Sequence, residues 1–339
     1  MLSNFNYSIL LLTLFFISWT KNQPMREYKI SGQAQGTTYA ASYFATDSLV
    51  TKSQIDSILN VVDLSMSLYK PNSTISKFNA MPAGKIKVDP HMNIVLKKSF
   101  QINKETDGFF DITIQPLMRL WGFYRAQAQK NLPDTNKINA LLKTSIGMNK
   151  IKLKRKSLSK QNRSIEIDLN GIAQGYAVDV VADFVASKGI KSYVFELGGE
   201  IRAKGPKPDG SQIKIGIEGP TTNEFENPDM KHIISFKQGA VTTSGSYRKY
   251  ISFNGKNYGH IINPKTSYPI NNGIISVTIF AEKAIDADGY DNALMLMPVQ
   301  KAIKFVESKK NLEAYIIYKK TDGTVTDTLT AGFKQMIVK

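Results

Sequence analysis

The sequence predicts an α+β protein, in which one large domain combines mixed or antiparallel sheets with packed helices. Two observations predict this fold. Strand-like apolar segments recur along the 339 residues, and amphipathic segments with helical spacing lie between them. With 42% hydrophobic and 10% aromatic residues, the chain can bury a substantial core. We find no internal repeat, low-complexity tract or convincing linker, so we expect a single domain over residues 25–339.

The N-terminus carries a short apolar run, Ser8 to Trp19. It is shorter than the roughly 20 residues that a membrane-spanning helix needs, and its length is typical of a signal-peptide core. No Lys or Arg precedes it, and no small-x-small cleavage site follows it. We expect residues 1–24 to be a signal peptide or an N-terminal anchor, and the protein to be exported. The chain has no cysteine, which excludes lipoprotein acylation, disulfides and thiol catalysis.

The charge balance is basic. Lys and Arg total 44 against 28 Asp and Glu, a formal net charge of +16. Such an excess is compatible with nucleic acid, an anionic membrane or an acidic small ligand. The basic residues are spread thinly, however, and no arginine-rich stripe alternates with aromatic residues, so we expect no nucleic-acid binding.

The first part of the chain predicts a strand followed by helices. Residues 28–44 are strand-like, with breaks expected at Gly32 and Gly36. Helical spacing covers the ranges 53–66, 91–106 and 134–144, and residues 150–163 read as an exposed basic hairpin.

Two residues of this part are candidates for a site. Tyr69 precedes a turn at Pro71 and is either a half-buried aromatic or a ligand contact. Asp111 stands between apolar neighbours, and a buried Asp needs partners. On the sequence alone we favour a turn carboxylate that is bonded to the backbone.

The stretch from Asp168 to Asp179, DLNGIAQGYAVD, most strongly predicts a site. Apolar residues alternate over 165–169, as in a half-buried strand, and then recur every four residues from Ile172, as on a helix that ends at Gly189. The first turn of a helix offers free N–H groups to a phosphate, and Asp168 beside it could hold a cation or a ligand. The alternative is an Asp that only caps an ordinary helix.

The second half predicts strands over 192–197, 232–236 and 276–281, with a turn-rich stretch over 204–230. We interpret Ser244 as a ligand or turn hydroxyl, because no nucleophile-elbow pattern surrounds it. The last predicted site helix bears Asp286, Asp288 and Asp291 within six positions. Oxygen ligands at this density suit a hard cation such as Mg²⁺, although an acidic helix start is also favoured by the helix dipole.

Eight motifs in order resemble the ApbE family, the FAD:protein FMN transferases, from about Gly36 to the end of the chain. They are GTTY, MSLYKPNSTISKFN, GFFDITIQPL with LWGF, DLNGIAQGYAVD, ELGGEI, TSGSYRKY, GHIINPKTSYP and ADGYDNAL. The resemblance implies Mg²⁺-dependent cleavage of FAD, attachment of FMN to a threonine hydroxyl of an acceptor protein, and release of AMP. It also implies export to the periplasmic side, with an inner-membrane anchor if the N-terminal segment is retained. The implied acceptor is a subunit of a membrane redox complex.

The resemblance also assigns residues. Metal binding is implied for Gly171, through its backbone carbonyl, and for Asp288 and Asn292, which share a helical face. Contacts to the flavin nucleotide are implied for the following residues: Gln35, Tyr69, Phe109, Phe110, Asp111, Asp168, Gln174, His260 and Ile261. Catalytic roles are implied for Asp288, for Tyr69 and for His260, the last as the base that accepts the threonine proton. Asp286 and Asp291 are alternative bases.

Three residues depart from the family pattern. Gln35 replaces a usual Met, Gln174 stands where Lys is common, and Asn292 falls where a Thr ligand is usual. Tyr69 agrees with transferases, whereas an Asn there accompanies hydrolysis of FAD to FMN and AMP in related enzymes. The alternatives to the transferase are therefore an FAD pyrophosphatase and a protein that binds FAD without turnover.

Overall fold

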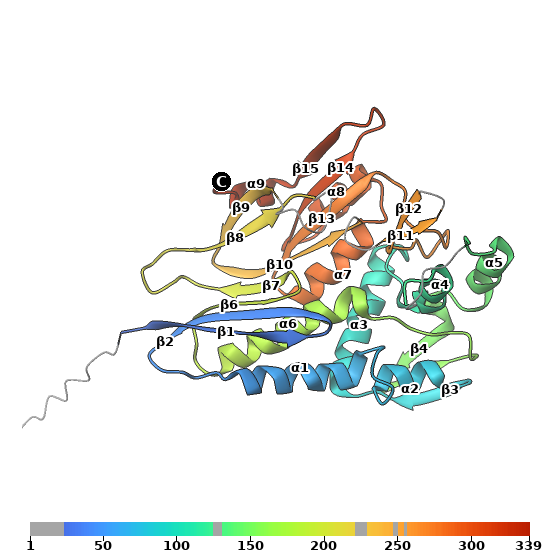
Figure 1. Ribbon diagram of the computed structural model, residues 1–339, viewed down its shortest axis with the longest axis horizontal. Coiled ribbons are helices and arrows are strands. Elements are labelled where there is room, and N and C mark those ends of the chain that lie inside the picture. The colour runs from blue at the N-terminus through green and yellow to red at the C-terminus, as the bar shows by residue number, and fades with distance from the viewer. Residues whose placement is uncertain (1–23, 125–130, 221–228, 247–249, 254–255) are drawn as a thin grey trace, which may run out of the picture.

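The computed structural model describes residues 24–124, 131–220, 229–246, 250–253 and 256–339. Its centre is an eight-stranded sheet in the order β1-β2-β6-β7-β10-β13-β14-β15, in which every neighbouring pair is antiparallel (Figure 1). The strands are β1 (Arg26–Ala34), β2 (Thr37–Ala45), β6 (Ser192–Leu197), β7 (Glu200–Lys204), β10 (Gln238–Gly245), β13 (Ile274–Ala281), β14 (Leu312–Lys319) and β15 (Val325–Leu329). Antiparallel sheets with packed helices confirm the predicted fold class.

Helices cover one face of this sheet. They are α1 (Lys52–Met66), α3 (Pro90–Glu105), α6 (Asn170–Ser187), α7 (Ala284–Leu294) and α8 (Val299–Glu307). Because side chains alternate along a strand, Ile316 of β14 packs in the core that these helices share, whereas Ile317 packs on the opposite face. In Figure 1, α6 and α7 lie together in the middle of the molecule, where both contact the sheet.

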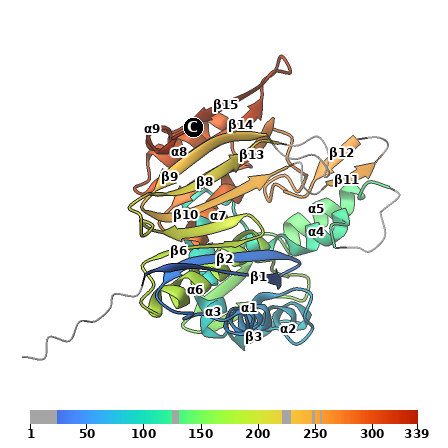
Figure 2. The ribbon, with the colours of Figure 1, turned by 60° about the vertical axis from the view of Figure 1, so that its left-hand side comes forward.

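A second, smaller layer covers the other face. It consists of the hairpin β8 (Ile213–Glu218) and β9 (Met230–Phe236) with α9 (Ala331–Met336), as Figure 2 shows from the side. The predicted turn-rich stretch over 204–230 was therefore wrong where β8 forms. Ile213, Ile215 and Ile217 alternate with exposed residues and are buried, which is a strand pattern that the surrounding Pro and Gly residues obscured.

The hairpin predicted over 150–163 forms as β4 (Ile151–Lys154) and β5 (Ser157–Lys160), and β5 also pairs with β3 (Gly84–Lys87) in the order β3-β5-β4. It is not exposed throughout, because Ile151, Leu158 and Lys160 are buried. Beside it lies α2 (Thr74–Ala80), and farther along lie η1 (Ile112–Ile114), α4 (Gln115–Trp121), α5 (Thr135–Thr144) and η2 (Met148–Lys150). Trp121 of α4 packs in a separate core with residues of β11 (Tyr250–Phe253) and β12 (Lys256–Gly259).

The predicted helices form where the sequence carries caps. Thr51 and Gln54 make a reciprocal capping box at α1, and the carboxylates of Asp89 and Asp134 accept N–H bonds at the starts of α3 and α5. A glycine follows the C-terminal end of α6: Gly189 has a positive φ of 80°, the left-handed geometry that the sequence predicts there.

The hairpin β1–β2 corrects one prediction about glycine. Its turn lies at Gln35 and Gly36, which both have positive φ, so the break at Gly36 is confirmed. Gly32 does not interrupt β1 and pairs with Tyr39 across the ladder. A Cβ at Gly32 would lie 2.6 Å from the Tyr39 ring, so this glycine provides space for the aromatic side chain.

Residues 165–169 are also not the predicted strand. They are extended and bury Ile165, Ile167 and Leu169, but they join no ladder. Instead, the amide of Asn79 bonds both the N–H and the C=O of Ile167, at 2.8 Å each. The N–H of Asp168 donates to the Ile112 carbonyl at 2.7 Å. The alternating pattern correctly predicts which side chains are buried. The backbone, however, is hydrogen-bonded by the Asn79 side chain and by the Ile112 carbonyl instead of by a neighbouring strand.

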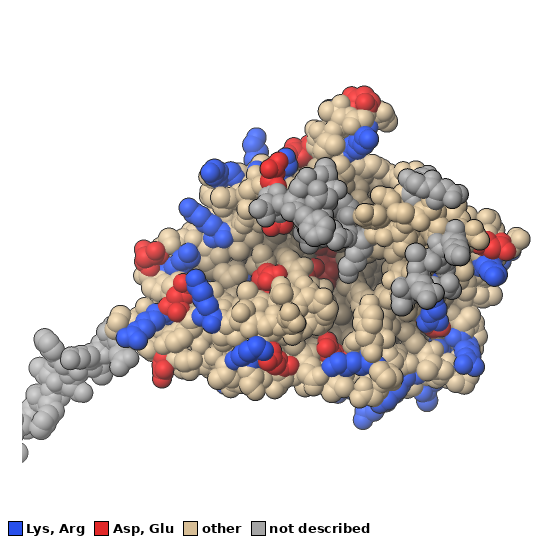
Figure 3. Space-filling model, in the orientation of Figure 1, with Lys and Arg blue, Asp and Glu red and all other residues tan. Residues whose placement is uncertain are grey.

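Lys and Arg side chains are scattered among Asp and Glu on the face shown in Figure 3, which agrees with the thin spread seen in the sequence. Across the described ranges, no helix has the length and apolar character needed to cross a bilayer. The apolar run Ser8 to Trp19 lies outside the described residues, so the expected division at residue 24 stays a prediction.

The close approach of α6 and α7 yields a stability prediction. A Cβ at Gly175 would lie 2.4 Å from the backbone oxygen of Ala284, which cannot move without shifting α7. We expect Gly175→Ala to lower the free energy of unfolding by about 2 kcal/mol or more.

The control is Gly289→Ala, whose Cβ would meet side chains and no backbone: the end of Ile102 at 2.4 Å and that of Ile172 at 3.1 Å. The ends of side chains shift more easily than backbone does, and alanine favours the helix by up to about 1 kcal/mol. Urea denaturation of both variants checks the difference; equal losses would show that the α6–α7 contact is not unusually tight.

Candidate active site between helices α6 and α7

Helices α6 and α7 are joined by hydrogen bonds in both directions, because each carries an Asp that accepts backbone N–H groups of the other. The Oδ2 of Asp288, on α7, accepts the N–H of Gly175, on α6, at 2.8 Å. In return, Asp179 of α6 accepts the N–H groups of Ala284 and Ile285 at the start of α7, at 3.0 Å each. Arg202 of β7 donates to the same Asp179 at 2.9 Å. These bonds fix the position of Asp288 relative to the first turn of α6.

Oxygen atoms crowd around the side-chain amide of Asn292. Its Nδ2 lies 3.4 Å from the Gly171 carbonyl oxygen and 3.3 Å from Asp288 Oδ1. It also lies 3.0 Å from both the Asp288 carbonyl oxygen and Asp291 Oδ1. An NH₂ group has two hydrogens and cannot satisfy four acceptors at once. The surplus of oxygen atoms is the arrangement that a cation would complete.

This set of atoms fits a hard cation. Gly171 departs from helical φ/ψ and its carbonyl faces Asn292, while Asp288 supplies a carboxylate. The orientation of an Asn amide is assigned from its hydrogen bonds. Its reversal would present Oδ1 to the same oxygen atoms, an arrangement that is favourable only with a cation between them. Within the described ranges, no three His, Cys, Asp or Glu side chains gather around a common point, so a carbonyl and an amide are needed to complete the set.

The three aspartates of α7 do not act as one group. Asp291 lies at the cluster, where it accepts bonds from Thr242 at 2.6 Å and from Ser244 at 2.9 Å. Ser244 is thus a strand residue of β10 that bonds to Asp291, so the turn alternative was wrong, and the ligand alternative stays a prediction. Asp286 lies elsewhere and pairs with Lys98 at 2.6 Å, so the expected grouping of all three was wrong.

Burial changes the protonation of the two clustered carboxyls. It raises the pKa of Asp288 to about 7, although the Gly175 N–H bond acts in the opposite direction. Burial, followed by the nearby charge of Asp288, raises the pKa of Asp291 well above its ordinary value. Two adjacent buried carboxyls that resist ionisation are the electrostatic condition that a divalent cation relieves.

Asp168 lies in the extended segment just before α6. It accepts a hydrogen bond from the Tyr124 hydroxyl and another from the Asn170 N–H, the latter at 2.8 Å. Burial raises its pKa. The ring of Tyr69 contacts that of Tyr124 edge to face at 6.3 Å between centroids, and Tyr69 itself is 77% exposed. An exposed aromatic therefore stands next to the buried carboxylate.

Phe109, Phe110 and Asp111 lie at one edge of the site. Asp111 accepts bonds from the Thr113 N–H and hydroxyl, at 2.8 and 2.6 Å, and caps η1. This agrees with the turn interpretation, and its contact with a nucleotide stays a prediction. Phe110 is buried, whereas Phe109 is partly exposed beneath the ammonium of Lys265, 4.0 Å from the ring centroid.

His260 and Ile261 begin the loop that carries Lys265. The loop closes on itself, since the Ile270 N–H donates to the Ile261 carbonyl at 2.9 Å. Trp121 anchors it through a 2.9 Å bond from Nε1 to the Ser267 carbonyl. His260 is partly buried and has interactions of its own. The remainder of the neighbouring predicted motif, Tyr247 to Lys249, lies outside the described residues.

Gln174 lies on α6 one turn after Gly171. Its Nε2 donates to the Leu197 carbonyl at 2.8 Å, and it fills the space beside Gly198 and Thr37. Gln35 occupies the turn before Thr37, with a positive φ of 54°. The hairpin β1–β2 and the Gly198–Gly199 turn therefore meet next to the start of α6.

Three residues of this region were missed as site residues. Tyr124 donates a hydrogen bond to Asp168. Thr242 donates to Asp291, and Arg202 donates to Asp179. Each comes from an element distant in sequence, so no spacing signal identifies it. Their positions emerge only from the fold.

Comparison with known proteins gives the same family throughout. The ApbE family model matches residues 35–316. A FAD:protein FMN transferase of Vibrio cholerae is 33% identical, covering 98% of this chain and 99% of its own. One of Haemophilus influenzae is 34% identical, covering 91% of this chain and 90% of its own.

Solved structures agree. The flavin transferase ApbE of Vibrio cholerae has a TM-score of 0.82 and 33% identity, covering 92% of this chain and 100% of its own. The apo form of the Pseudomonas stutzeri flavinyl transferase ApbE has a TM-score of 0.81 and 28% identity, covering 93% of this chain and 98% of its own. The resemblance drawn from the motifs is confirmed: the chain belongs to the ApbE family.

Proposed function

We propose that this chain transfers FMN from FAD to a threonine hydroxyl of an acceptor protein and releases AMP. The observation that carries the proposal is the oxygen cluster of Gly171, Asp288 and Asn292, which lies beside the buried carboxylate of Asp168 and the exposed ring of Tyr69. Relatives named as FAD:protein FMN transferases over nearly the full chain support the flavin-transfer activity.

The reaction is a phosphoryl transfer. The threonine oxygen attacks the phosphorus of the FMN half of FAD, the bond from that phosphorus to the AMP oxygen breaks, and the threonine proton goes to a base. A Mg²⁺ held by Gly171, Asp288 and Asn292 would neutralise charge on the pyrophosphate. Asp168 and Tyr69 would orient the nucleotide, because one supplies a fixed acceptor and the other an accessible aromatic face.

His260 is our choice for the base. A neutral imidazole accepts a proton near neutral pH, and His260 begins a loop that Trp121 holds in place. Asp286 is a weaker alternative because Lys98 neutralises it. Asp291 is also weaker, since it already accepts bonds from Thr242 and Ser244.

The acceptor and the location are proposed on sequence grounds. The apolar run Ser8 to Trp19 supports export. An enzyme on the periplasmic side, with or without an inner-membrane anchor, would meet a subunit of a membrane redox complex as its acceptor.

The deciding experiment incubates the protein with FAD, Mg²⁺ and a threonine-bearing acceptor, and compares wild type with Tyr69→Asn. We expect wild type to give flavinylated acceptor and AMP. Tyr69→Asn should give more free FMN and less flavinylated acceptor, because water replaces the acceptor beside the exposed ring. FAD recovered intact, or FMN and AMP without acceptor labelling by wild type, would contradict the transferase. The same ratio of free FMN to flavinylated acceptor in both proteins would show that Tyr69 has only a packing role.

The metal assignment predicts a pH-dependent stabilisation. In the metal-free protein the raised pKa of Asp288 means that the folded state holds an extra proton between about pH 4 and pH 7, so this stabilising contribution is lost as pH rises through about 7. Mg²⁺ binds the ionised carboxylate, so its increase of Tm should be larger at about pH 8 than at about pH 5.5.

Asp288→Asn should lose this Mg²⁺-dependent increase, and its FAD cleavage should fall on the order of a hundredfold or more. Asp322→Asn, on an exposed turn, is the matched control. Retention of both properties by Asp288→Asn would exclude Asp288 as a metal ligand.

The base assignment predicts that His260→Gln lowers flavinylation by roughly a hundredfold or more at saturating FAD and acceptor. The acidic limb of the pH–rate profile should disappear with it, while FAD affinity is preserved. A variant that keeps both the rate and the acidic limb would show that another group accepts the proton.

A further inference from the structure

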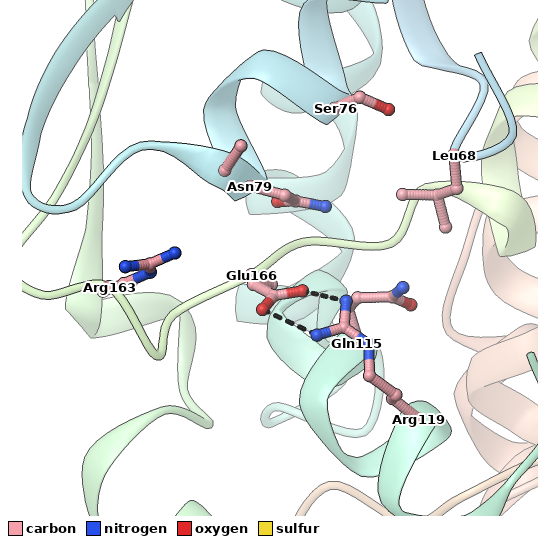
Figure 4. A pocket seen from close by; sticks show the side chains of 8 residues that line it. Leu68, Ser76, Asn79, Gln115, Arg119, Arg163 and Glu166 are labelled. Atoms are coloured by element: carbon pink, nitrogen blue, oxygen red, sulfur yellow. Dashed lines mark hydrogen bonds and ion pairs between the residues drawn. The ribbon is translucent and has the colours of Figure 1, made fainter. Parts of the chain in front are cut away.

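A pocket of about 320 Å³ lies next to the site but shares none of its predicted residues (Figure 4). Its lining includes Leu68, Asn79, Gln115, Arg119, Arg163 and Glu166. These residues come from the turn before α2, from α2, from α4 and from the segment that leads into α6. The pocket adjoins the site at two points, because Leu68 precedes Tyr69 and Glu166 is two residues from Asp168.

The charges in this pocket are unequal. Arg119 is paired with Glu166 through both guanidinium nitrogens, with 3.0 Å between Nη1 and Oε1. Arg163 is exposed and forms no ion pair with another described residue. Figure 4 shows Arg163 on one side of the Arg119–Glu166 pair and Gln115 on the other. The lining therefore holds two cations and one anion, which favours an anionic group.

The side-chain oxygen of Gln115 indicates that a ligand of this pocket also carries a hydrogen-bond donor. Its side chain is buried, with 5% of the residue exposed, and its Oε1 has no hydrogen-bond partner in the described part of the chain. A buried acceptor without a partner costs about 1–3 kcal/mol. The amide of neighbouring Asn79 is bonded to the N–H and C=O of Ile167 and makes no bond to Gln115 Oε1. A group that enters the pocket with an N–H donor would remove this cost.

An extended polypeptide with an acidic side chain satisfies both requirements. Its carboxylate would face Arg163, and a backbone N–H could reach Gln115. Sulfate or chloride would satisfy the arginine but offers no donor to the amide oxygen. Because the pocket begins one residue from exposed Tyr69, a peptide bound there would lie beside the place where the flavin nucleotide is proposed to sit.

We propose that this pocket binds the acceptor polypeptide through an Asp or Glu side chain close to the target threonine. This inference rests on the proposed function and adds a rule for choosing the acceptor. Arg163 and Gln115 act as specificity-determining residues, and they take no part in cleaving FAD.

The test uses an array of short synthetic peptides, each with one Thr and with Asp, Asn or Lys at each flanking position. Peptide binding, flavinylation and acceptor-free cleavage of FAD are measured for wild type, for Arg163→Glu and for the control Arg26→Glu. Arg26 is an exposed residue at the start of β1. We expect wild type and Arg26→Glu to bind and label acidic peptides at least about tenfold better than the Lys series, a difference of about 1.4 kcal/mol. Arg163→Glu should reverse this preference while acceptor-free FAD cleavage is unchanged.

A second variant, Gln115→Met, removes the unpaired acceptor at similar volume. It should leave the fold intact and weaken the binding of acidic peptides without changing FAD cleavage. Two outcomes would overturn the proposal: a preference that is unchanged in Arg163→Glu, or wild type that binds acidic and basic peptides equally or binds none. Loss of FAD affinity in Arg163→Glu would also overturn it, because the pocket would then hold part of the nucleotide. Failure of the proposed function is distinct, since wild type would then bind acidic peptides but flavinylate none.

Discussion

The site depends on the reciprocal hydrogen bonds between α6 and α7, in which an Asp of each helix accepts backbone N–H groups of the other. Asp179 bonds the first N–H groups of α7, and Asp288 bonds the N–H of Gly175, where the absence of a side chain lets the helices approach closely. Arg202 of the sheet compensates the charge of Asp179, so the pair of helices is tied to β7. Without these bonds, the Gly171 carbonyl and the Asn292 amide would not face each other across the helix interface.

Local signals in the sequence predicted most helices of the fold but not all of its strands. Helical spacing predicted α1 and α3, and their starts lie one residue earlier than predicted because Thr51 and Asp89 cap them. Residues 165–169 show the limit of periodicity. Alternation reports which side chains are buried, but it cannot tell whether a strand or the Asn79 side chain satisfies the backbone. For β8, the Pro and Gly residues around it outweighed a short alternating run of isoleucines.

For the candidate site, motif spacing predicted the neighbours that share an element but not those that meet through the fold. Asp288 and Asn292 lie one helical turn apart, so their common face was predictable. Counting Asp286 with them failed because one helical face cannot hold all three aspartates, and Lys98 of α3 neutralises it. Tyr124, Thr242 and the pocket around Gln115 could not be anticipated, since each is built from segments far apart in the chain.

The central claim is that the oxygen atoms between α6 and α7 form a cation site. A crystal structure of the protein soaked with Mn²⁺, which prefers the same oxygen ligands as Mg²⁺, tests it most directly through the anomalous signal of the metal. The account predicts a metal peak in contact with the Gly171 carbonyl oxygen, Asp288 and Asn292, with the Asn292 amide turned to present Oδ1. A metal bound elsewhere, or an Asn292 Nδ2 that still faces the four oxygen atoms with Mn²⁺ present, would contradict it.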